Sequence, residues 1–246
     1  MSNPKSGLDY LLQGLQLLRE PGLRRYVAVP LLVSTLCFAG AIYGLGFWLD
    51  VLLESLLGKL PDWLDWLRYL LWPVFAAAAL LVVFYSFSIL TNLVAAPFNS
   101  MLAEAVEQHL SGQAIDTGGW KELLADIIPG LLSELRKLLY FALRALPLGV
   151  LFLVPGINIA APVLWALFSA WMLAIEYCDY PMANHRLHFA QQRRLLATRR
   201  GLCWGFGGAT LLLTLVPIIN FLAMPAAVAG ATAMWVGEFR DQQDQS

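Results

Sequence analysis

A short basic segment near the N-terminus has the residue types of an anion site. Gly22 and Leu23 separate Pro21 from two adjacent arginines, Arg24 and Arg25. Proline is favoured at the first position of a helix, where the next backbone N–H groups have no intrahelical partner. Such a helix start binds tetrahedral oxyanions, and a guanidinium adds two parallel hydrogen bonds. The pattern predicts an oxyanion site at Gly22, Leu23, Arg24 and Arg25. The alternative is that these arginines anchor an apolar helix or contact lipid phosphates.

A second group of reactive side chains lies in the last third of the chain. It contains Glu176, Asp179, His185 and His188, and a His-x-x-His pair beside carboxylates can bind a metal. Pro181 interrupts this segment, and no zincin-type glutamate lies between the histidines, so a solvated connector is the favoured interpretation. The arginines of the same segment could form an anion vestibule. They are Arg186, Arg193, Arg194, Arg199 and Arg200.

Polar side chains in or beside the uncharged segments are candidates for an anion pathway. Two related sequences, 153–158 and 215–220, place Asn158 and Asn220 at matching positions beside prolines that interrupt a helix. Hydrocarbon permits such interruptions only where protein or a water-lined cavity satisfies the freed backbone groups, and paired interruptions mark transport sites. Helix capping is the alternative role of these two amides. The pathway candidates are Asn92, Asn99, Glu104, Asn158 and Asn220.

Composition indicates what kind of molecule positions these groups. Hydrophobic residues make up 59% of the chain, charged residues make up 13%, and the mean hydropathy is +0.65. These values are typical of a membrane protein and not of a soluble domain. The formal net charge of -1 lacks the basic excess of a nucleic-acid-binding protein. The widely spaced Cys37, Cys178 and Cys203 predict packed free thiols instead of disulfides or a zinc site.

The expected elements follow from the segments that contain no charged residue, which are 26–49, 69–103, 145–175 and 201–237. A spanning helix needs about 20 apolar residues, so the first two are predicted to be complete transmembrane helices. Prolines break the last two near their middles, which leaves arms that reach about the bilayer midplane. We therefore expect an all-α integral membrane protein with two half-inserted helical hairpins. Residues 1–246 would form a single membrane domain, with interfacial helices over 4–20 and 121–144.

The positions of the basic residues agree with this topology. Lys and Arg favour the cytoplasmic side of a membrane. If both hairpins return to their own side, every Lys and Arg except Lys59 and Arg68 lies inside. If all four segments crossed once, the arginine-rich connector 176–200 would face outward. Inverted insertion is the alternative.

Six segments together form a specific signature, and they are 21–25, 69–73, 95–99, 168–172, 176–181 and 230–235. In these segments, and over nearly its whole length, the chain resembles the CysZ sulfate permeases of bacteria, within the etoposide-induced-protein-like membrane family. The resemblance implies a multi-pass protein of the bacterial inner membrane that brings sulfate into the cytoplasm for cysteine synthesis. It also implies two long membrane helices with half-inserted hairpins. The Gly-Leu-Arg sulfate motif of the family falls on Gly22, Leu23 and Arg24, with Arg25 beside it.

Electrostatics limits the mechanism of such a permease. Moving a dianion inward against an inside-negative potential costs about 4.6 kcal/mol per 100 mV, so a channel needs a steep gradient or rapid consumption. We expect a channel-like pathway, and proton coupling through Glu104, Glu176 or Asp179 is the alternative. Two other classes stay open: a membrane-embedded metal-dependent enzyme built on His185 and His188, and a lipid-organising protein.

The expected partners follow from the same patterns. We expect sulfate and membrane lipid as ligands, with no nucleic acid, cofactor, resident metal or catalytic residue. Gly40 and Gly44 form a small-residue step in the first span, which favours close helix packing. We therefore expect a homo-oligomer.

Overall fold

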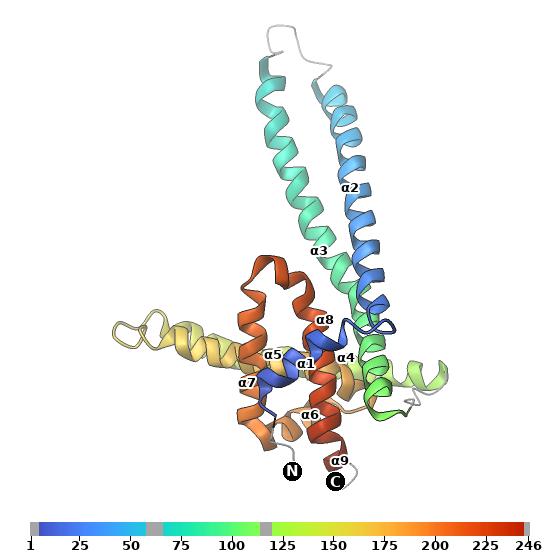
Figure 1. The fold of residues 1–246 in the computed structure, drawn as a ribbon. Helices are drawn as coiled ribbons and strands as arrows, with labels where there is room; N and C mark the ends of the chain where they lie inside the picture. The colour runs from blue at the N-terminus through green and yellow to red at the C-terminus, as the bar shows by residue number, and fades with distance from the viewer. Residues whose placement is uncertain (1–4, 58–65, 114–119, 244–246) are drawn as a thin grey trace. The chain divides into compact units, whose positions relative to one another are not determined.

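The computed structural model describes residues 5–57, 66–113 and 120–243 (Figure 1). Within these ranges the chain forms helices and no strand, which confirms the predicted all-α class. The helices in order are α1 (Gly7–Leu17), α2 (Arg25–Leu57), α3 (Trp66–Ser111), α4 (Trp120–Leu151), α5 (Ala161–Asn184), α6 (Phe189–Leu196), α7 (Arg200–Thr214), α8 (Pro217–Met234) and α9 (Arg240–Gln243). A short 3-10 turn precedes α7, and a π-helical turn joins α8 to α9.

The chain divides into two compact units. One unit contains Met1–Arg25 and Asn99–Ser246, and the other contains Tyr26–Phe98. Helix α2 and most of α3 belong to the second unit, whereas the C-terminal end of α3 belongs to the first. We call them the core unit and the two-helix unit.

The two-helix unit has the surface of a membrane span. Leu32, Leu36 and Phe47 on α2 are 60%, 63% and 69% exposed. A helix that is apolar on all sides, yet not covered by protein, is stable in hydrocarbon. Arg25–Trp48 is long and apolar enough to cross a membrane, as predicted for 26–49. The second predicted span, 69–103, lies inside the continuous helix α3, many of whose side chains fall outside the described residues.

The core unit is held together by close contacts between small residues. Helix α1 packs against α7 and α8, and α5 packs against the same two helices. A Cβ atom added at Gly7 would overlap the backbone of α7, and one added at Gly14 would overlap the carbonyl oxygen of Ala226 in α8. Likewise, a Cβ at Gly207 would overlap the carbonyl of Ala170 in α5. Glycine is therefore required at these crossings, because the backbones touch there.

Helix α1 is packed more deeply than a helix lying on a membrane surface. It begins at a capping box in which Ser6 and Asp9 satisfy each other's backbone N–H groups. Tyr10 and Leu11 are 4% and 2% exposed, because they face α7 and α8. Leu8, on the opposite side, is 51% exposed. The predicted interfacial helix is therefore part of the protein core on one face.

The arms of the first hairpin, α4 and α5, are longer than the uncharged segment 145–175 suggested. Helix α4 runs without a break from Trp120 through Pro129 and Pro147, so the predicted interfacial helix 121–144 and the first arm are one element. Helix α5 continues past Ile175 to Asn184, and it is long and apolar enough to cross a membrane. So is Leu222–Gln242. The expected arm lengths of the first hairpin are therefore wrong, because Glu176 and Asp179 beyond the apolar run are paired with Lys137 and do not end α5. In the second hairpin, α7 begins and ends close to the expected arm.

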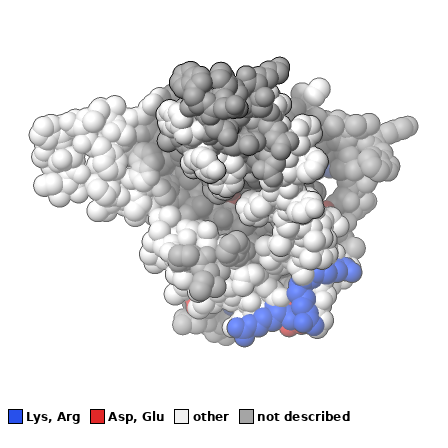
Figure 2. All heavy atoms as spheres, turned by 90° about the horizontal axis from the view of Figure 1, so that it is seen from above, with Lys and Arg blue, Asp and Glu red and all other residues white. Residues whose placement is uncertain are grey.

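Both interruptions expose apolar side chains at their turns. Leu153 and Ile159, between α4 and α5, are 81% and 82% exposed, and Leu215, between α7 and α8, is 70% exposed. Figure 1 shows these two turns at different ends of the core unit. On the face shown in Figure 2, most described side chains carry no charge and the Lys and Arg side chains gather at one edge. The exposed apolar side chains at the two turns suit contact with lipid.

Candidate functional site

The predicted oxyanion segment lies in a turn between α1 and α2. Helix α2 begins at Arg25, so Pro21 is not the first residue of a helix, and that part of the prediction is wrong. The carbonyl oxygen of Glu20 accepts hydrogen bonds from the N–H groups of Leu23 and Arg24, at 3.0 and 3.1 Å. The turn therefore uses two of the backbone donors that were expected to face an ion.

Burial separates the roles of the side chains in this turn. Leu23 is 3% exposed, whereas Gly22, Arg24 and Arg25 are exposed. Leu23 thus anchors the turn and holds its neighbours at the surface, directly before the apolar helix α2. A Cβ atom added at Gly22 would meet nothing within 4 Å, so the backbone there is open to a ligand. Arg24 has no carboxylate partner among the described residues.

Two of the pathway candidates lie in the buried part of α3. Asn99 is 6% exposed, and its Nδ2 donates to the hydroxyl of Tyr180 at 3.3 Å and lies 3.4 Å from the sulfur of Met224. Asn220 lies one helical turn before Met224, so these two amides belong to one region of the core unit. Glu104 is half-buried, and burial raises the pKa of its carboxyl. The side chain of Asn92, in α3, lies outside the described residues.

The amides at the two interruptions do not cap helices. The N-cap residues of α5 and α8 are Ala160 and Val216, and neither helix start has a side-chain cap. Asn158 and Asn220 are exposed, and their backbone N–H groups donate to the residue four positions earlier, at 3.0 and 2.8 Å. Gly156 has a φ of +86°, which glycine adopts without strain and which closes the first turn. The capping alternative is therefore wrong, and the amides remain available to a ligand.

A buried contact between a carboxylate and an imidazole, which sequence reasoning missed, joins α3, the end of α5 and the C-terminal segment. Glu107 is 1% exposed, and its two oxygens lie 2.9 and 3.0 Å from Nε2 of His185. Nε of Arg240 lies 3.9 Å from the same carboxylate. The His185 ring also packs 5.2 Å from the Trp235 ring. His185 is thus committed to this pair, and no group of three potential metal ligands occurs among the described residues.

The acidic residues of the connector surround a buried lysine. Nζ of Lys137 on α4 lies 2.9 Å from Glu134, 3.0 Å from Glu176 and 2.8 Å from Asp179. Gln192 donates to the other oxygen of Asp179 at 2.6 Å. Burial alone would lower the pKa of Lys137, but Asp179 and Glu176 raise that pKa well above its usual value. Lys137 is therefore charged throughout the physiological range, and its single positive charge balances part of the charge of the three carboxylates around it.

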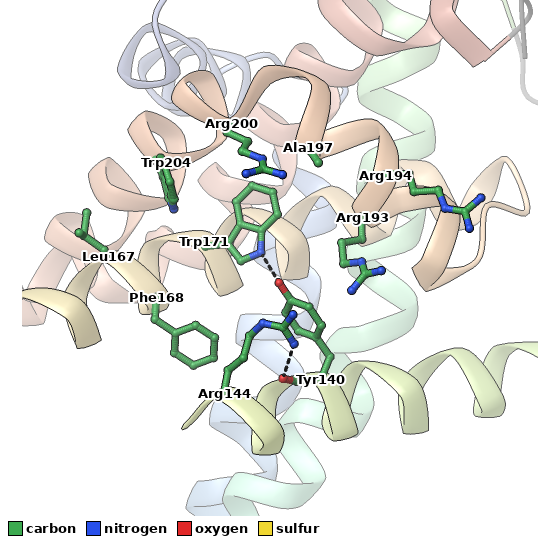
Figure 3. A pocket seen from close by; sticks show the side chains of 10 residues that line it. All are labelled: Tyr140, Arg144, Leu167, Phe168, Trp171, Arg193, Arg194, Ala197, Arg200 and Trp204. Carbon is green, nitrogen blue, oxygen red and sulfur yellow. Dashed lines mark hydrogen bonds between the residues drawn. The ribbon is translucent and has the colours of Figure 1, made fainter. Parts of the chain in front are cut away.

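Part of the predicted arginine vestibule lines a real cavity of about 480 Å³ (Figure 3). Arg193, Arg194 and Arg200 contribute to its wall, together with Arg144 from α4. Arg199 instead forms an ion pair with Glu238. The remaining lining residues are Tyr140, Leu167, Phe168, Trp171, Ala197 and Trp204. The cavity therefore combines guanidinium groups with aromatic rings and has no acidic side chain among its lining residues.

A comparison with known families gives one result for the chain. Residues 10–225 match the family described as Sulfate transporter CysZ/Etoposide-induced protein 2.4. The matched range contains the turn before α2, the pathway candidates, Lys137 with its carboxylates, and the arginine-lined cavity.

Proposed function

Because the chain belongs to the sulfate transporter CysZ/etoposide-induced protein 2.4 family, we propose that it is a sulfate permease of the bacterial inner membrane. It would bring sulfate into the cytoplasm for cysteine biosynthesis, without catalytic chemistry and through a channel-like pathway. The observation that carries this proposal is the turn before α2. There the buried Leu23 holds the guanidinium of Arg24 at the start of a lipid-exposed helix, without a carboxylate to neutralise it.

The chemistry of this turn suits sulfate. A guanidinium presents a planar pair of N–H donors that matches two oxygens of a tetrahedral dianion. The exposed backbone at Gly22 allows an ion to approach the turn closely. Each charge-assisted hydrogen bond contributes about 1.5–3 kcal/mol, so loss of the Arg24 guanidinium should weaken sulfate binding by about 10- to 100-fold. Arg25 would supply a second guanidinium at the first residue of α2.

The route beyond this turn is proposed to follow neutral amides. Asn99 and Asn220 share one region of the core unit, where they could replace part of the hydration shell of the ion. Asn158 supplies an exposed amide at the other interruption. Glu104 is half-buried in α3, and burial raises the pKa of its carboxyl. Asn92 remains on the proposed route as a candidate from the sequence alone.

The test is uptake of labelled sulfate into proteoliposomes that contain the full chain. Arg24→Ala should reduce uptake about tenfold or more, and Arg24→Lys should have an intermediate effect, because it keeps the charge but loses the planar fork. Arg19→Ala is the matched control, since Arg19 is an exposed arginine in the same connection. Uptake unchanged in Arg24→Ala would remove this turn from the route. Absence of uptake by the unmodified protein would refute the permease itself.

Proton coupling is the second candidate mechanism, and the raised pKa of Glu104 favours it. If Glu104 carries a proton with sulfate, a pH gradient at clamped voltage should drive uptake, and Glu104→Gln should abolish that dependence. A channel predicts instead a sulfate-evoked current that carries negative charge and is unaffected by the pH gradient.

A further inference from the structure

We propose that the cavity between α4, α5, α6 and α7 is a binding site for the phosphate headgroup of an anionic membrane lipid. The general ligand chemistry is that of a tetrahedral oxyanion, which could come from a lipid or from a free ion. This site is separate from the turn before α2 and does not depend on the sulfate pathway.

The charge of the cavity points to an anion. Arg144, Arg193, Arg194 and Arg200 line it, and none of them has a carboxylate partner among the described residues. Several carboxylates elsewhere in the core unit, in contrast, are paired with cations, as at Asp179. Guanidiniums that face one cavity repel one another, so an anion bound among them would remove an unfavourable interaction.

The aromatic wall holds these groups in position. The indole Nε1 of Trp171 donates to the hydroxyl of Tyr140 at 3.0 Å, which fixes the Tyr140 ring (Figure 3). Cζ of Arg144 lies 3.6 Å from the centroid of this ring, and Cζ of Arg193 lies 5.3 Å from it. Nη1 of Arg144 also donates to the carbonyl oxygen of Tyr140 at 3.5 Å. A cation held on a ring face can direct its other in-plane N–H donors at a ligand. The Trp171 and Trp204 rings, 6.2 Å apart, form the adjoining apolar wall.

Position and size favour a lipid over a free ion. Arg144 and Arg200 directly precede the uncharged segments 145–175 and 201–237, so they mark the boundary where lipid phosphates lie. The cavity, about 480 Å³, has the size of sites that hold many-atom ligands. Its apolar side is open to lipid, because Leu167 is 49% exposed and Trp204 is 44% exposed. A headgroup could thus contact the arginines while its acyl chains follow the apolar side.

The experiment is calorimetric titration of the delipidated full chain in detergent with four probes. These are short-chain phosphatidylglycerol, short-chain phosphatidylcholine, inorganic phosphate and sulfate. We expect phosphatidylglycerol to bind at least tenfold more tightly than phosphatidylcholine and than either free ion. Arg193→Gln/Arg194→Gln should weaken phosphatidylglycerol binding at least tenfold. Arg136→Gln, at an exposed arginine of α4 outside the cavity, should leave it unchanged.

Three results would overturn the proposal. Equal binding of the two lipids would show that charge is not recognised, and unchanged binding by the double variant would place the lipid elsewhere. Free phosphate or sulfate binding as tightly as phosphatidylglycerol would identify a free-ion site. If the double variant does not elute as a folded species, Arg200→Gln replaces it. The preference of the unmodified protein for phosphatidylglycerol over phosphatidylcholine tests charge recognition without any variant.

Discussion

Replacement of Lys137 tests whether the buried cluster on α4 and α5 stabilises the core unit. Lys137→Met keeps most of the side-chain volume but leaves the carboxylates of Glu134, Glu176 and Asp179 without their cation. Breaking a buried ion pair costs about 3–5 kcal/mol. Glu134 and Glu176 have side chains that are 54% and 48% exposed, so water screens part of that loss. We expect the free energy of unfolding to fall by about 2–3 kcal/mol.

The pH dependence of this effect has a defined sign. The folded-state pKa of Lys137 is raised above its ordinary value of 10.5, so its contribution is fully present below pH 10.5. That contribution is lost only as pH rises through the still higher folded value. Burial also raises the pKa of Glu134, so acid neutralises this carboxyl at a higher pH than usual. The gap between Lys137→Met and the unmodified protein should therefore be constant from about pH 7 to 9 and shrink toward acid.

The assay is thermal unfolding of the purified protein in detergent, followed by tryptophan fluorescence. A loss of 2–3 kcal/mol corresponds to a fall of about 5–10 °C in the transition temperature of a domain of this size. Arg136→Met is the matched control, because Arg136 is the exposed neighbour of Lys137 on the same helix, and its effect should stay within about 0.5 kcal/mol. An unchanged or higher transition temperature for Lys137→Met would show that the cluster does not stabilise the fold.

Two further predictions concern α1. Gly14→Val should lower the free energy of unfolding by at least about 1–3 kcal/mol, because the added atoms overlap the backbone at Ala226. The control is Gly149→Ala, at an open position within α4, which should leave stability unchanged or raise it slightly. If thermal unfolding shows the same change for Gly14→Val as for Gly149→Ala, the packing of α1 against α8 is contradicted. Hydrogen bonds from the backbone and side chain of Ser6 lower the pKa of the Asp9 carboxyl. The stabilisation of α1 by this cap is therefore fully present above pH 3.8, and it is lost as pH falls through the lower folded-state pKa. Asp9→Asn should remove this dependence, measured as the transition temperature between pH 5 and 2.5.

The elements that could be predicted from sequence are those that depend only on the requirement for backbone hydrogen bonding in a bilayer. A long uncharged segment must be helical in hydrocarbon, so the span beginning near Tyr26 followed from composition. The interruptions near Pro155 and Pro217 also lie where the sequence predicts them, at prolines inside uncharged segments. Proline alone does not identify an interruption, because Pro129 and Pro147 lie inside the continuous helix α4. These features need no knowledge of which helices touch.

The contacts across helices could not be predicted in the same way. Lys137 pairs with Asp179, 42 positions away in sequence, and that pairing lets α5 continue beyond the uncharged segment. Glu107 and His185 are 78 positions apart, and neither residue alone indicates a partner. The cavity arginines were partly anticipated as a vestibule. Arg144 was not, because it comes from a different helix and is held there by an aromatic ring.

Pairing of the acidic side chains explains how a chain with a net charge of -1 can attract a sulfate dianion. Within the core unit, Asp179 pairs with Lys137, Glu238 pairs with Arg199, and Glu107 lies 3.9 Å from Nε of Arg240. Arg24 has no such partner among the described residues. These internal pairs largely cancel at a distance, so the field that an approaching sulfate meets at the turn before α2 is set mainly by the unpaired guanidinium of Arg24. Added salt should thus weaken sulfate uptake at low sulfate concentration, because it screens the surface arginines more strongly than the buried pairs.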